Sequence, residues 1–252
     1  MNKIICVSNQ KGGVGKTTTT NALAMGLRHK GYRVLCVDFD PQGNLSFSLR
    51  ADNRVELQNS IYQVLKGELK AVQAIQHTEL ADVITSNMML SGIELEFTGK
   101  GREFLLSSAL KSVEKLYDYI LIDAPPTLGG WVMNILCASD KVIIPVEASP
   151  WGMFGLANMF EFLNEVKQIS PDLEVAGIAV TKVDTRKNYF KQTMETLHQL
   201  ESIYVFEHVI RVDSSVEWSQ DNSVPVVEYK KSSRSAKEYT ELAEEVMNRV
   251  SR

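Results

Sequence analysis

Short apolar runs rich in β-branched residues recur along the 252-residue chain, and longer amphipathic stretches separate them. Several runs are apolar nearly throughout, which is typical of parallel strands covered on both faces. The expected strands are residues 3–8, 33–38, 82–86, 118–123, 141–146, 175–181 and a less regular run at 204–210. Strands that alternate with helices predict a doubly wound, mostly parallel twisted α/β sheet with helices on both faces, in a single domain over residues 1–252.

The first expected strand leads into a glycine-rich loop, "NQKGGVGKTT", and then into an expected helix at residues 16–30. Gly31 follows that helix and can take the left-handed conformation that ends many helices. In such a sheet ligands bind at the carboxyl ends of the strands. A strand, a glycine-rich loop and a helix in this order predict a phosphate-binding loop.

The residues of this loop have separate expected roles. Backbone N–H groups would turn toward the phosphate oxygens, and the helix behind them adds a favourable dipole. Lys16 would reach the β- and γ-phosphates, Thr17 would ligate Mg²⁺, and Thr18 would donate to the α-phosphate. The residues expected to bind phosphate through their backbone are Gly12, Gly13, Val14 and Gly15.

Acidic residues follow two further expected strands. Asp38 and Asp40 lie in "VDFDPQGN", where Pro41 and Gly43 force the chain into a loop. We expect Asp38 to support either Mg²⁺ or the loop itself.

The strand "DYILID" ends in Asp123 and continues into "APPTLGG". A carboxylate that ends an apolar strand near a phosphate loop predicts an Mg²⁺ contact through water. Pro126 stiffens the following turn, whereas Gly129 leaves it free to move. We therefore expect this segment to order with ATP and to relax after hydrolysis.

Two positions depart from the usual phosphate-loop string. Gln10 stands where the first glycine is common, and a second lysine, Lys11, precedes Lys16. The string "KGGVGKTT" resembles the deviant phosphate loop of the ParA/MinD family of ATPases, which have the P-loop NTPase fold, and the chain is most similar to the short, Soj-like ParA partition ATPases. The resemblance implies that Lys11 reaches across a dimer interface to the partner's nucleotide and has no role in its own subunit's site. It also implies that the acidic loops are two switches and that Asp40 positions or activates the attacking water.

The same resemblance implies cofactors and partners. ATP and Mg²⁺ are the expected cofactors. The expected partners are a second copy of the chain in the ATP state, nonspecific double-stranded DNA, and a ParB-like centromere-binding protein that stimulates an otherwise slow ATPase. The string "AVTKVD" at residues 179–184 is similar to the N-K-x-D guanine reader of GTPases, but Thr181 replaces the asparagine and the resemblance implies adenine. The segment at 208–226 departs from the family pattern, which leaves the adenine contacts and the choice of partner open.

The formal net charge of −4 means that any DNA contact must come from a local basic patch. Basic clusters occur at residues 182–191 and 229–237. Short ParA proteins bind DNA through basic residues in this part of the chain, whereas solvated surface lysines are the alternative reading. The candidate DNA-binding residues are Arg186, Lys187, Arg211 and Lys230.

A MinD-like membrane- or scaffold-associated positioning ATPase is the alternative function. The C-terminal stretch has an apolar stripe formed by Tyr239, Leu242, Val246 and Val250. Its polar face is rich in glutamate, which is unfavourable on an anionic membrane. We expect this stripe to pack against the domain, without stable insertion into a membrane.

Cys6, Cys36 and Cys137 lie in apolar runs without metal-like spacing. This pattern predicts reduced cysteines in a core and argues against an iron–sulfur carrier. No motif for a small-molecule substrate pocket is found. Because no apolar run approaches a membrane span and no signal-peptide pattern precedes the first strand, we expect a cytoplasmic protein. The resemblance to ParA proteins further implies that it associates with the nucleoid.

Overall fold

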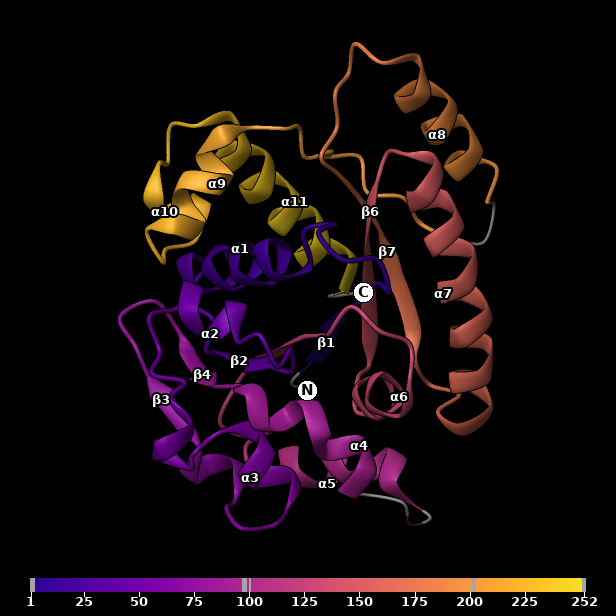
Figure 1. Cartoon of the computed structure of the whole chain (residues 1–252). Helices are drawn as coiled ribbons and strands as arrows, with labels where there is room; N and C mark the ends of the chain where they lie inside the picture. Colours follow the sequence, from indigo (N-terminus) through magenta and orange to yellow (C-terminus); the bar gives the residue numbers. More distant parts are fainter. Residues whose placement is uncertain (1–2, 97–98, 100, 201–202, 251–252) are drawn as a thin grey trace.

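A seven-stranded sheet forms the centre of the computed structural model, which describes residues 3–96, 99, 101–200 and 203–250 (Figure 1). The strand order is β3-β4-β2-β5-β1-β6-β7, in which β3 alone is antiparallel to its neighbour. The strands are β1 (Lys3–Val7), β2 (Val34–Asp38), β3 (Ile75–His77), β4 (Asp82–Ile84), β5 (Tyr119–Asp123), β6 (Lys141–Glu147) and β7 (Glu174–Thr181). The expected mostly parallel, doubly wound sheet is confirmed.

Helices cover both faces of this sheet. The α-helices are α1 (Lys16–His29), α2 (Asn44–Ser48), α3 (Ile61–Leu65), α4 (Ile93–Glu96), α5 (Leu105–Leu110), α6 (Gly130–Cys137), α7 (Pro150–Ile169), α8 (Asn188–His198), α9 (Ser214–Asp221), α10 (Val226–Tyr229) and α11 (Arg234–Val250). Short 3₁₀ turns are η1 (Val55–Leu57), η2 (Ala71–Gln73), η3 (Met88–Gly92) and η4 (Arg102–Phe104). Residues of α1, α2, α10 and α11 fill one core, and residues of α3, α5, α6 and α7 fill the other.

Alternate strand residues supply the two cores. In β1, Ile4 and Cys6 face the core under α6 and α7, whereas Ile5 and Val7 face the core under α1 and α11. Because successive side chains of a strand point to opposite faces, a strand buried on both faces must be apolar at every position. This explains the continuous apolar runs of the sequence.

The C-terminal helix α11 packs against α1, and the two lie side by side in Figure 1. Its apolar stripe is buried, as expected, because Tyr239, Leu242, Val246 and Val250 all belong to the core shared with α1. Within the described residues, no helix combines the length and the apolar character needed to cross a membrane.

Two expectations from the pattern are wrong, and the pattern missed one strand. Residues 204–210 form no strand. Their backbone meets β7 through an isolated bridge between Ile178 and Val205 and through the N–H of Ile210, which donates to the Val180 carbonyl at 2.9 Å. Strand β3 was not expected, because its three residues "IQH" carry a single apolar side chain. Cys137 is half-buried at the end of α6, whereas Cys6 and Cys36 are buried as expected.

Candidate functional site

The register of the central strands places the ends of β1, β2 and β5 next to one another. Asp123 is the Cα partner of Val7 on one side and of Asp38 on the other. The loop after β1 and the two acidic loops therefore meet at the carboxyl edge of the sheet, where ligands of this fold class bind.

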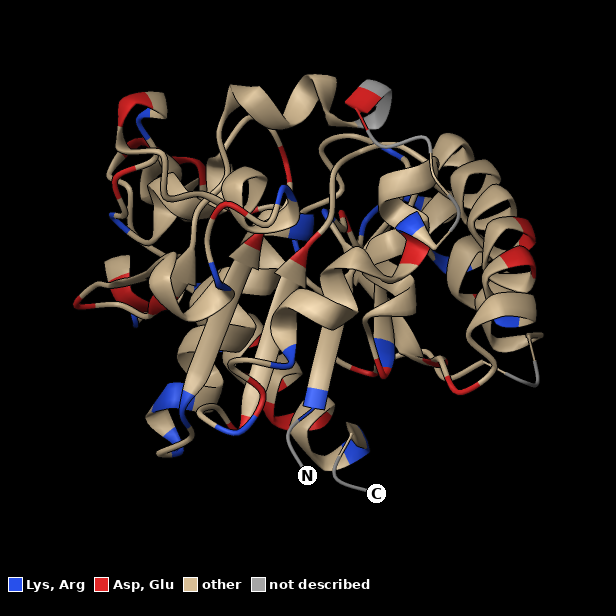
Figure 2. Ribbon diagram, turned by 90° about the horizontal axis from the view of Figure 1, so that it is seen from below, with Lys and Arg blue, Asp and Glu red and all other residues tan. Residues whose placement is uncertain are grey.

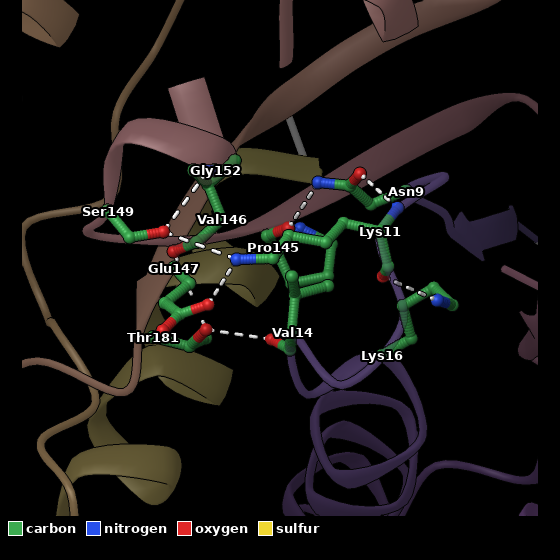
Figure 3. Close-up of polar contacts among 10 residues, drawn as sticks. All are labelled: Asn9, Lys11, Val14, Lys16, Pro145, Val146, Glu147, Ser149, Gly152 and Thr181. Atoms are coloured by element: carbon green, nitrogen blue, oxygen red, sulfur yellow. Dashed lines mark hydrogen bonds and ion pairs between the residues drawn. The ribbon is translucent and has the colours of Figure 1, made fainter. Parts of the chain in front are cut away.

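The phosphate loop has the backbone conformation that its glycines predict. Gly13 and Gly15 have φ angles of 73° and 88°, in the left-handed region that favours glycine. Val14 between them is buried, and its carbonyl accepts a hydrogen bond of 2.7 Å from Thr181 Oγ1 at the end of β7. The loop is thus fixed to β7, the edge strand on the far side of β6 (Figure 3).

A second tether holds the start of the loop. Asn9 Nδ2 donates to the carbonyl of Pro145 at 2.8 Å, and Asn9 Oδ1 accepts from the backbone N–H of Lys11 at 3.0 Å (Figure 3). Gly12 is exposed next to this tether, and an added Cβ on Gly12 would lie 4.0 Å from Pro126 Cβ of the second acidic loop. The loop is therefore bounded by β6 and β7 on one side and by Pro126 on the other.

Lys16 begins α1 and points back over the loop. Its ammonium donates to the carbonyl of Lys11 at 3.1 Å, and only 7% of the residue is exposed (Figure 3). Burial lowers the pKa of Lys16, and the nearby carboxylates of Asp123 and Asp40 act in the opposite direction. The structure thus brings Lys16, expected at the phosphates, near Asp123, expected at Mg²⁺, and Asp40, expected at the attacking water.

Asp123 and Thr17, the two residues expected to contact Mg²⁺, lie in contact with each other. Thr17 Oγ1 donates to Asp123 Oδ2 at 2.6 Å, and Thr20 Oγ1 donates to Asp123 Oδ1 at 3.4 Å. Burial, followed by the like charge of Asp38, raises the pKa of Asp123 to about 8. A buried carboxylate next to a hydroxyl suits Mg²⁺, which prefers oxygen ligands and would offset this unfavourable charge.

The two aspartates of the first acidic loop have different hydrogen-bond partners. Asp38 is fully buried and accepts hydrogen bonds from the N–H of Ser46 at 2.7 Å, from Ser46 Oγ at 2.7 Å and from the N–H of Asp40 at 3.1 Å. Burial raises the pKa of Asp38 to about 6, although these hydrogen bonds lower it. Of the two expected roles, the contacts favour support of the loop. The side chain of Asp40 accepts from the N–H of Gln42 at 3.0 Å, and Pro41 is half-buried in this turn.

The second acidic loop passes close to the phosphate loop. Pro126 is exposed and faces Gly12, as described above, whereas Pro125 is buried. Gly129 is extended and precedes α6, and its carbonyl accepts from the N–H of Met133 at 3.0 Å. The loop therefore lies where it can respond to a group bound beside Gly12.

Lys11 has partners in its own chain, which the sequence did not predict. Its ammonium forms an ion pair with Glu147 at the end of β6 and donates to Ser149 Oγ at 3.2 Å (Figure 3). Ser149 caps α7, because its side chain also accepts from the N–H of Gly152 at 3.1 Å. Glu147 and Ser149 were not predicted, because they lie 136 and 138 residues from Lys11 in sequence.

The candidate DNA-binding residues lie on three segments. Arg186 pairs with Asp184 through two hydrogen bonds of 2.9 Å, and the next residue, Lys187, is exposed before α8. Arg211 is paired with Glu238 of α11, and Lys230 is exposed after α10. Basic and acidic positions are interspersed over the ribbon in Figure 2.

The divergent segment at 208–226 reaches the nucleotide-binding edge. Gln220 of α9 donates from Nε2 to Thr18 Oγ1 at 3.3 Å. Thr18 is the residue expected at the α-phosphate, so α9 lies beside the part of the site from which a nucleoside would extend. Gln220 had not been predicted, and no local motif marks it.

The chain is similar to known proteins over most of its length. The family model described as an AAA domain matches residues 2–175. The chain is 37% identical to the sporulation initiation inhibitor protein Soj of Bacillus subtilis, with 98% of each chain covered. It is 36% identical to the chromosome partitioning protein ParA of Myxococcus xanthus, with 98% of this chain and 88% of that protein covered.

A solved structure shares the same fold. This is cobyrinic acid a,c-diamide synthase from Mycobacterium smegmatis with a bound ATP analog and magnesium. The superposition covers 100% of this chain and 96% of the synthase chain, with a TM-score of 0.86 and 30% sequence identity. ATP and Mg²⁺ are accordingly the cofactors of this chain. Since relatives match nearly the whole chain and the phosphate loop carries the second lysine, the chain belongs to the ParA/MinD family of partition ATPases.

Proposed function

We propose that this chain is a DNA-partition ATPase that works as a nucleotide-dependent switch. ATP binding closes a dimer of two chains, the dimer binds nonspecific double-stranded DNA, and hydrolysis stimulated by a ParB-like partner releases it. The cycle places the protein in the cytoplasm on the nucleoid. The relatives named Soj and ParA support this proposal.

The position of Lys11 is the observation that carries the proposal. Lys11 and Lys16 belong to the same loop, yet Lys16 points over the loop while Lys11 points away from it to Glu147 and Ser149 (Figure 3). A lysine held at the rim of its own site can be presented to a second chain once Glu147 releases it. There it would act as an added positive charge beside the transferred phosphoryl group, as an arginine finger does.

Each of the remaining residues of the site has a separate role in hydrolysis. Lys16 binds the β- and γ-phosphates, and Thr17 and Asp123 hold Mg²⁺, which offsets negative charge on the phosphates when bound. Asp40 orients the attacking water, which does not require a strong base because phosphoryl transfer depends mainly on positioning and charge. Asp38 keeps Asp40 in place through the N–H of Asp40.

DNA binding would join two modest basic surfaces in one dimer. Lys187 and Lys230 are exposed, whereas Arg186 and Arg211 each have an acidic partner in the same chain. Contacts to phosphate alone are sequence-blind and weaken as salt rises. Pairing two weak surfaces raises the affinity through effective concentration, so that a chain with a net charge of −4 can still bind DNA as a dimer.

The test is binding to a nonspecific duplex with ATP, with ADP and without nucleotide, using the Asp40→Ala protein to block turnover. We expect binding with ATP only, and its loss when salt is raised or when Lys187 and Lys230 are both changed to alanine. Lys16→Ala is the control that should lose nucleotide and DNA together. Lys111→Ala and Lys167→Ala, combined, are the matched control for removal of two exposed lysines elsewhere.

Two outcomes would contradict the proposal. Absence of DNA binding in every nucleotide state, with ATP-dependent dimerisation intact, would favour the MinD-like alternative and direct the search to a membrane or protein scaffold. Rapid ATP turnover without DNA or a partner would instead indicate an enzyme that acts on a small molecule.

A further inference from the structure

Ser46 of α2 joins the two ends of the first acidic loop. It lies eight residues after Asp38, and both residues are fully buried. The N–H and the Oγ of Ser46 donate to the same oxygen of Asp38, Oδ2, each at 2.7 Å. The end of β2 and the start of α2 are therefore held together at a single carboxylate oxygen.

The other oxygen of this carboxylate binds the backbone of Asp40. Asp38 Oδ1 accepts from the N–H of Asp40 at 3.1 Å. Because a carboxylate is planar and rigid, two hydrogen bonds that fix Oδ2 also fix the direction in which Oδ1 points. Ser46 therefore sets the orientation of the group that holds Asp40.

The hydroxyl of Ser46 is itself held by the end of β4. Its Oγ accepts from the N–H of Ser86 at 3.2 Å, across 40 residues of sequence. Strands β2 and β4 pair in parallel with Val37 opposite Ile84, so Asp38 and Ser86 follow neighbouring strands at the same edge of the sheet. Since an N–H can only donate, the hydroxyl proton is left to point at Asp38, and the side chain has one direction.

The turn between Asp40 and α2 is tightly packed. The N–H of Gly43 donates to the carbonyl of Asp40 at 2.8 Å, and Gly43 has a φ angle of 66°. A Cβ added to Gly43 would lie 2.2 Å from Asn53 Nδ2 and 3.3 Å from the carbonyl oxygen of Ser86. A displacement of Ser46 would consequently be passed on to Asp40, because the turn between them has no space in which to adjust.

We propose that Ser46 is a positioning residue for ATP hydrolysis, which orients Asp38 so that Asp38 holds Asp40 where it can orient the attacking water. The hydroxyl of Ser46 does this by joining the N–H of Ser86 to Asp38 Oδ2. The proposal rests on the proposed role of Asp40. Its consequence is a slower hydrolysis step, with nucleotide binding preserved, when the hydroxyl is removed.

The experiment measures kcat and KM for ATP with Mg²⁺ in the wild type and in Ser46→Ala, Ser46→Val and Ser46→Thr. We expect Ser46→Ala and Ser46→Val to lower kcat about 10- to 100-fold, as for a misplaced catalytic group, and to leave KM within about twofold. Ser46→Thr retains a hydroxyl and should retain most of the wild-type kcat. Threonine and valine are both β-branched, so comparison of these two variants isolates the hydroxyl from the added bulk.

A buried serine of the same helix provides the matched control. Ser48 Oγ donates to the carbonyl of Leu45 at 2.9 Å, and so it is not directed at Asp38. We expect Ser48→Ala to lower the unfolding temperature, as Ser46→Ala does, without lowering kcat. The backbone hydrogen bond from Ser46 to Asp38 survives in every variant, and circular dichroism at the assay temperature checks that each one is folded.

A double-mutant comparison tests whether Ser46 acts through Asp40. In an Asp40→Ala protein the carboxylate to be positioned is missing, so adding Ser46→Ala should not slow single-turnover hydrolysis further. An equal effect of Ser46→Ala in the presence and in the absence of Asp40 would overturn the proposal, because it would show that Ser46 acts by another route.

Three other results would also overturn it. One is a wild-type kcat in both Ser46→Ala and Ser46→Val, and another is an equal kcat in Ser46→Thr and Ser46→Val, which would leave the hydroxyl without a part. The third is a raised KM with an unchanged kcat, which would place Ser46 in nucleotide binding. Hydrolysis by Asp40→Ala alone at the wild-type rate would refute the proposed role of Asp40, and it is a separate result because that protein retains Ser46.

Discussion

Three lysine ammonium groups lie around the phosphate loop in three different environments. Lys16 is buried over the loop, Lys11 is paired with Glu147 at its rim, and Lys182 is exposed beside Gly13. The same side chain therefore has a different cost of desolvation and a different freedom to move at each position. On this basis we propose that Lys16 binds the phosphates and that Lys11 acts on a second chain.

Asp40→Ala should separate binding from hydrolysis. The change removes the carboxylate expected to orient water but leaves Lys16, Thr17 and Asp123 in place. We expect ATP affinity within about threefold of the wild type and a turnover number at least about 100-fold lower, as for loss of a positioned catalytic group. Phosphate release under single-turnover conditions measures this. Asp172→Ala, at an exposed position before β7, is the control, and turnover of Asp40→Ala at the wild-type rate would contradict the assigned role.

At the scale of elements, helices α1 and α11 pack unusually close together at a glycine of α1. A Cβ added to Gly26 of α1 would lie only 2.6 Å from Ala243 Cβ of α11. The two helices therefore meet almost backbone to backbone, and α1 is the helix that begins at the phosphate loop. The packing of α11 is consequently part of the support of the nucleotide site.

Gly26→Ala should destabilise the protein. Overpacking at this contact costs about 1–3 kcal/mol, which exceeds the gain of at most about 1 kcal/mol in helix propensity. Urea denaturation measures the free energy of unfolding. Adding Ala243→Gly should restore part of the loss by removing the opposing methyl group, whereas Gly92→Ala, with no atom within 4 Å of its added Cβ, should not destabilise the protein. A Gly26→Ala protein as stable as the wild type would show that α11 can shift freely.

Glu245 ties α11 to the irregular segment after α8. Its carboxylate accepts from Tyr204 Oη at 2.8 Å, from the N–H of Glu207 at 2.8 Å, and from the N–H and Nδ1 of His208 at 3.2 Å and 2.7 Å. Burial acts to raise the pKa of Glu245, but these hydrogen bonds together lower it. Because the pKa is lower in the folded protein, the stabilisation is present above the unfolded value, about 4.3, and is lost as pH falls through the folded value.

Glu245→Gln should therefore lower stability in a pH-dependent way. At pH 7 we expect a loss of about 1–3 kcal/mol, because the hydrogen bonds to a charged acceptor are weakened. The difference from the wild type should narrow as the pH is lowered below about 4, where the wild-type carboxylate begins to be protonated. Denaturation curves at several pH values measure this. Glu241→Gln, exposed on the same helix, is the control, and a difference that stayed constant with pH would contradict the mechanism.

At the scale of the whole molecule, features that depend on neighbouring residues could be predicted from the sequence. Contacts between residues far apart in the sequence could not. The phosphate loop and Asp123 follow strands directly, so their place at the carboxyl edge could be predicted from the chain around them. Glu147 could not be found, because it meets Lys11 only when β6 is placed beside β1. The run at 204–210 resembles a strand in composition, yet its backbone meets β7 only at separated points, so no ladder forms along its length.

Loss of the Lys11–Glu147 ion pair should have its largest effect on self-association of the chain. If the pair must open before Lys11 reaches a second chain, Glu147→Gln should favour the dimer. We expect half-maximal dimerisation at an ATP concentration a few-fold lower, about 3- to 10-fold, since the competing ion pair is partly exposed. Light scattering against ATP concentration measures this in an Asp40→Ala background. Glu165→Gln, exposed on α7, is the control.

An unchanged or higher ATP requirement in Glu147→Gln would mean that the pair does not oppose dimerisation. In that case Glu147 would serve only to hold Lys11 beside Ser149, the residue that caps the start of α7.

Both ends of the described chain lie away from the nucleotide-binding edge. Lys3 opens β1 at the amino edge of the sheet, and Arg249 near the end of α11 donates to the carbonyl of Ala176 close to the start of β7 at 3.5 Å. The two ends are neighbours at the bottom of Figure 2. A fluorescent label attached near Lys3 or near Arg249 would therefore stand on the side of the sheet opposite the carboxyl edge, so it could report on the protein without covering the phosphate loop.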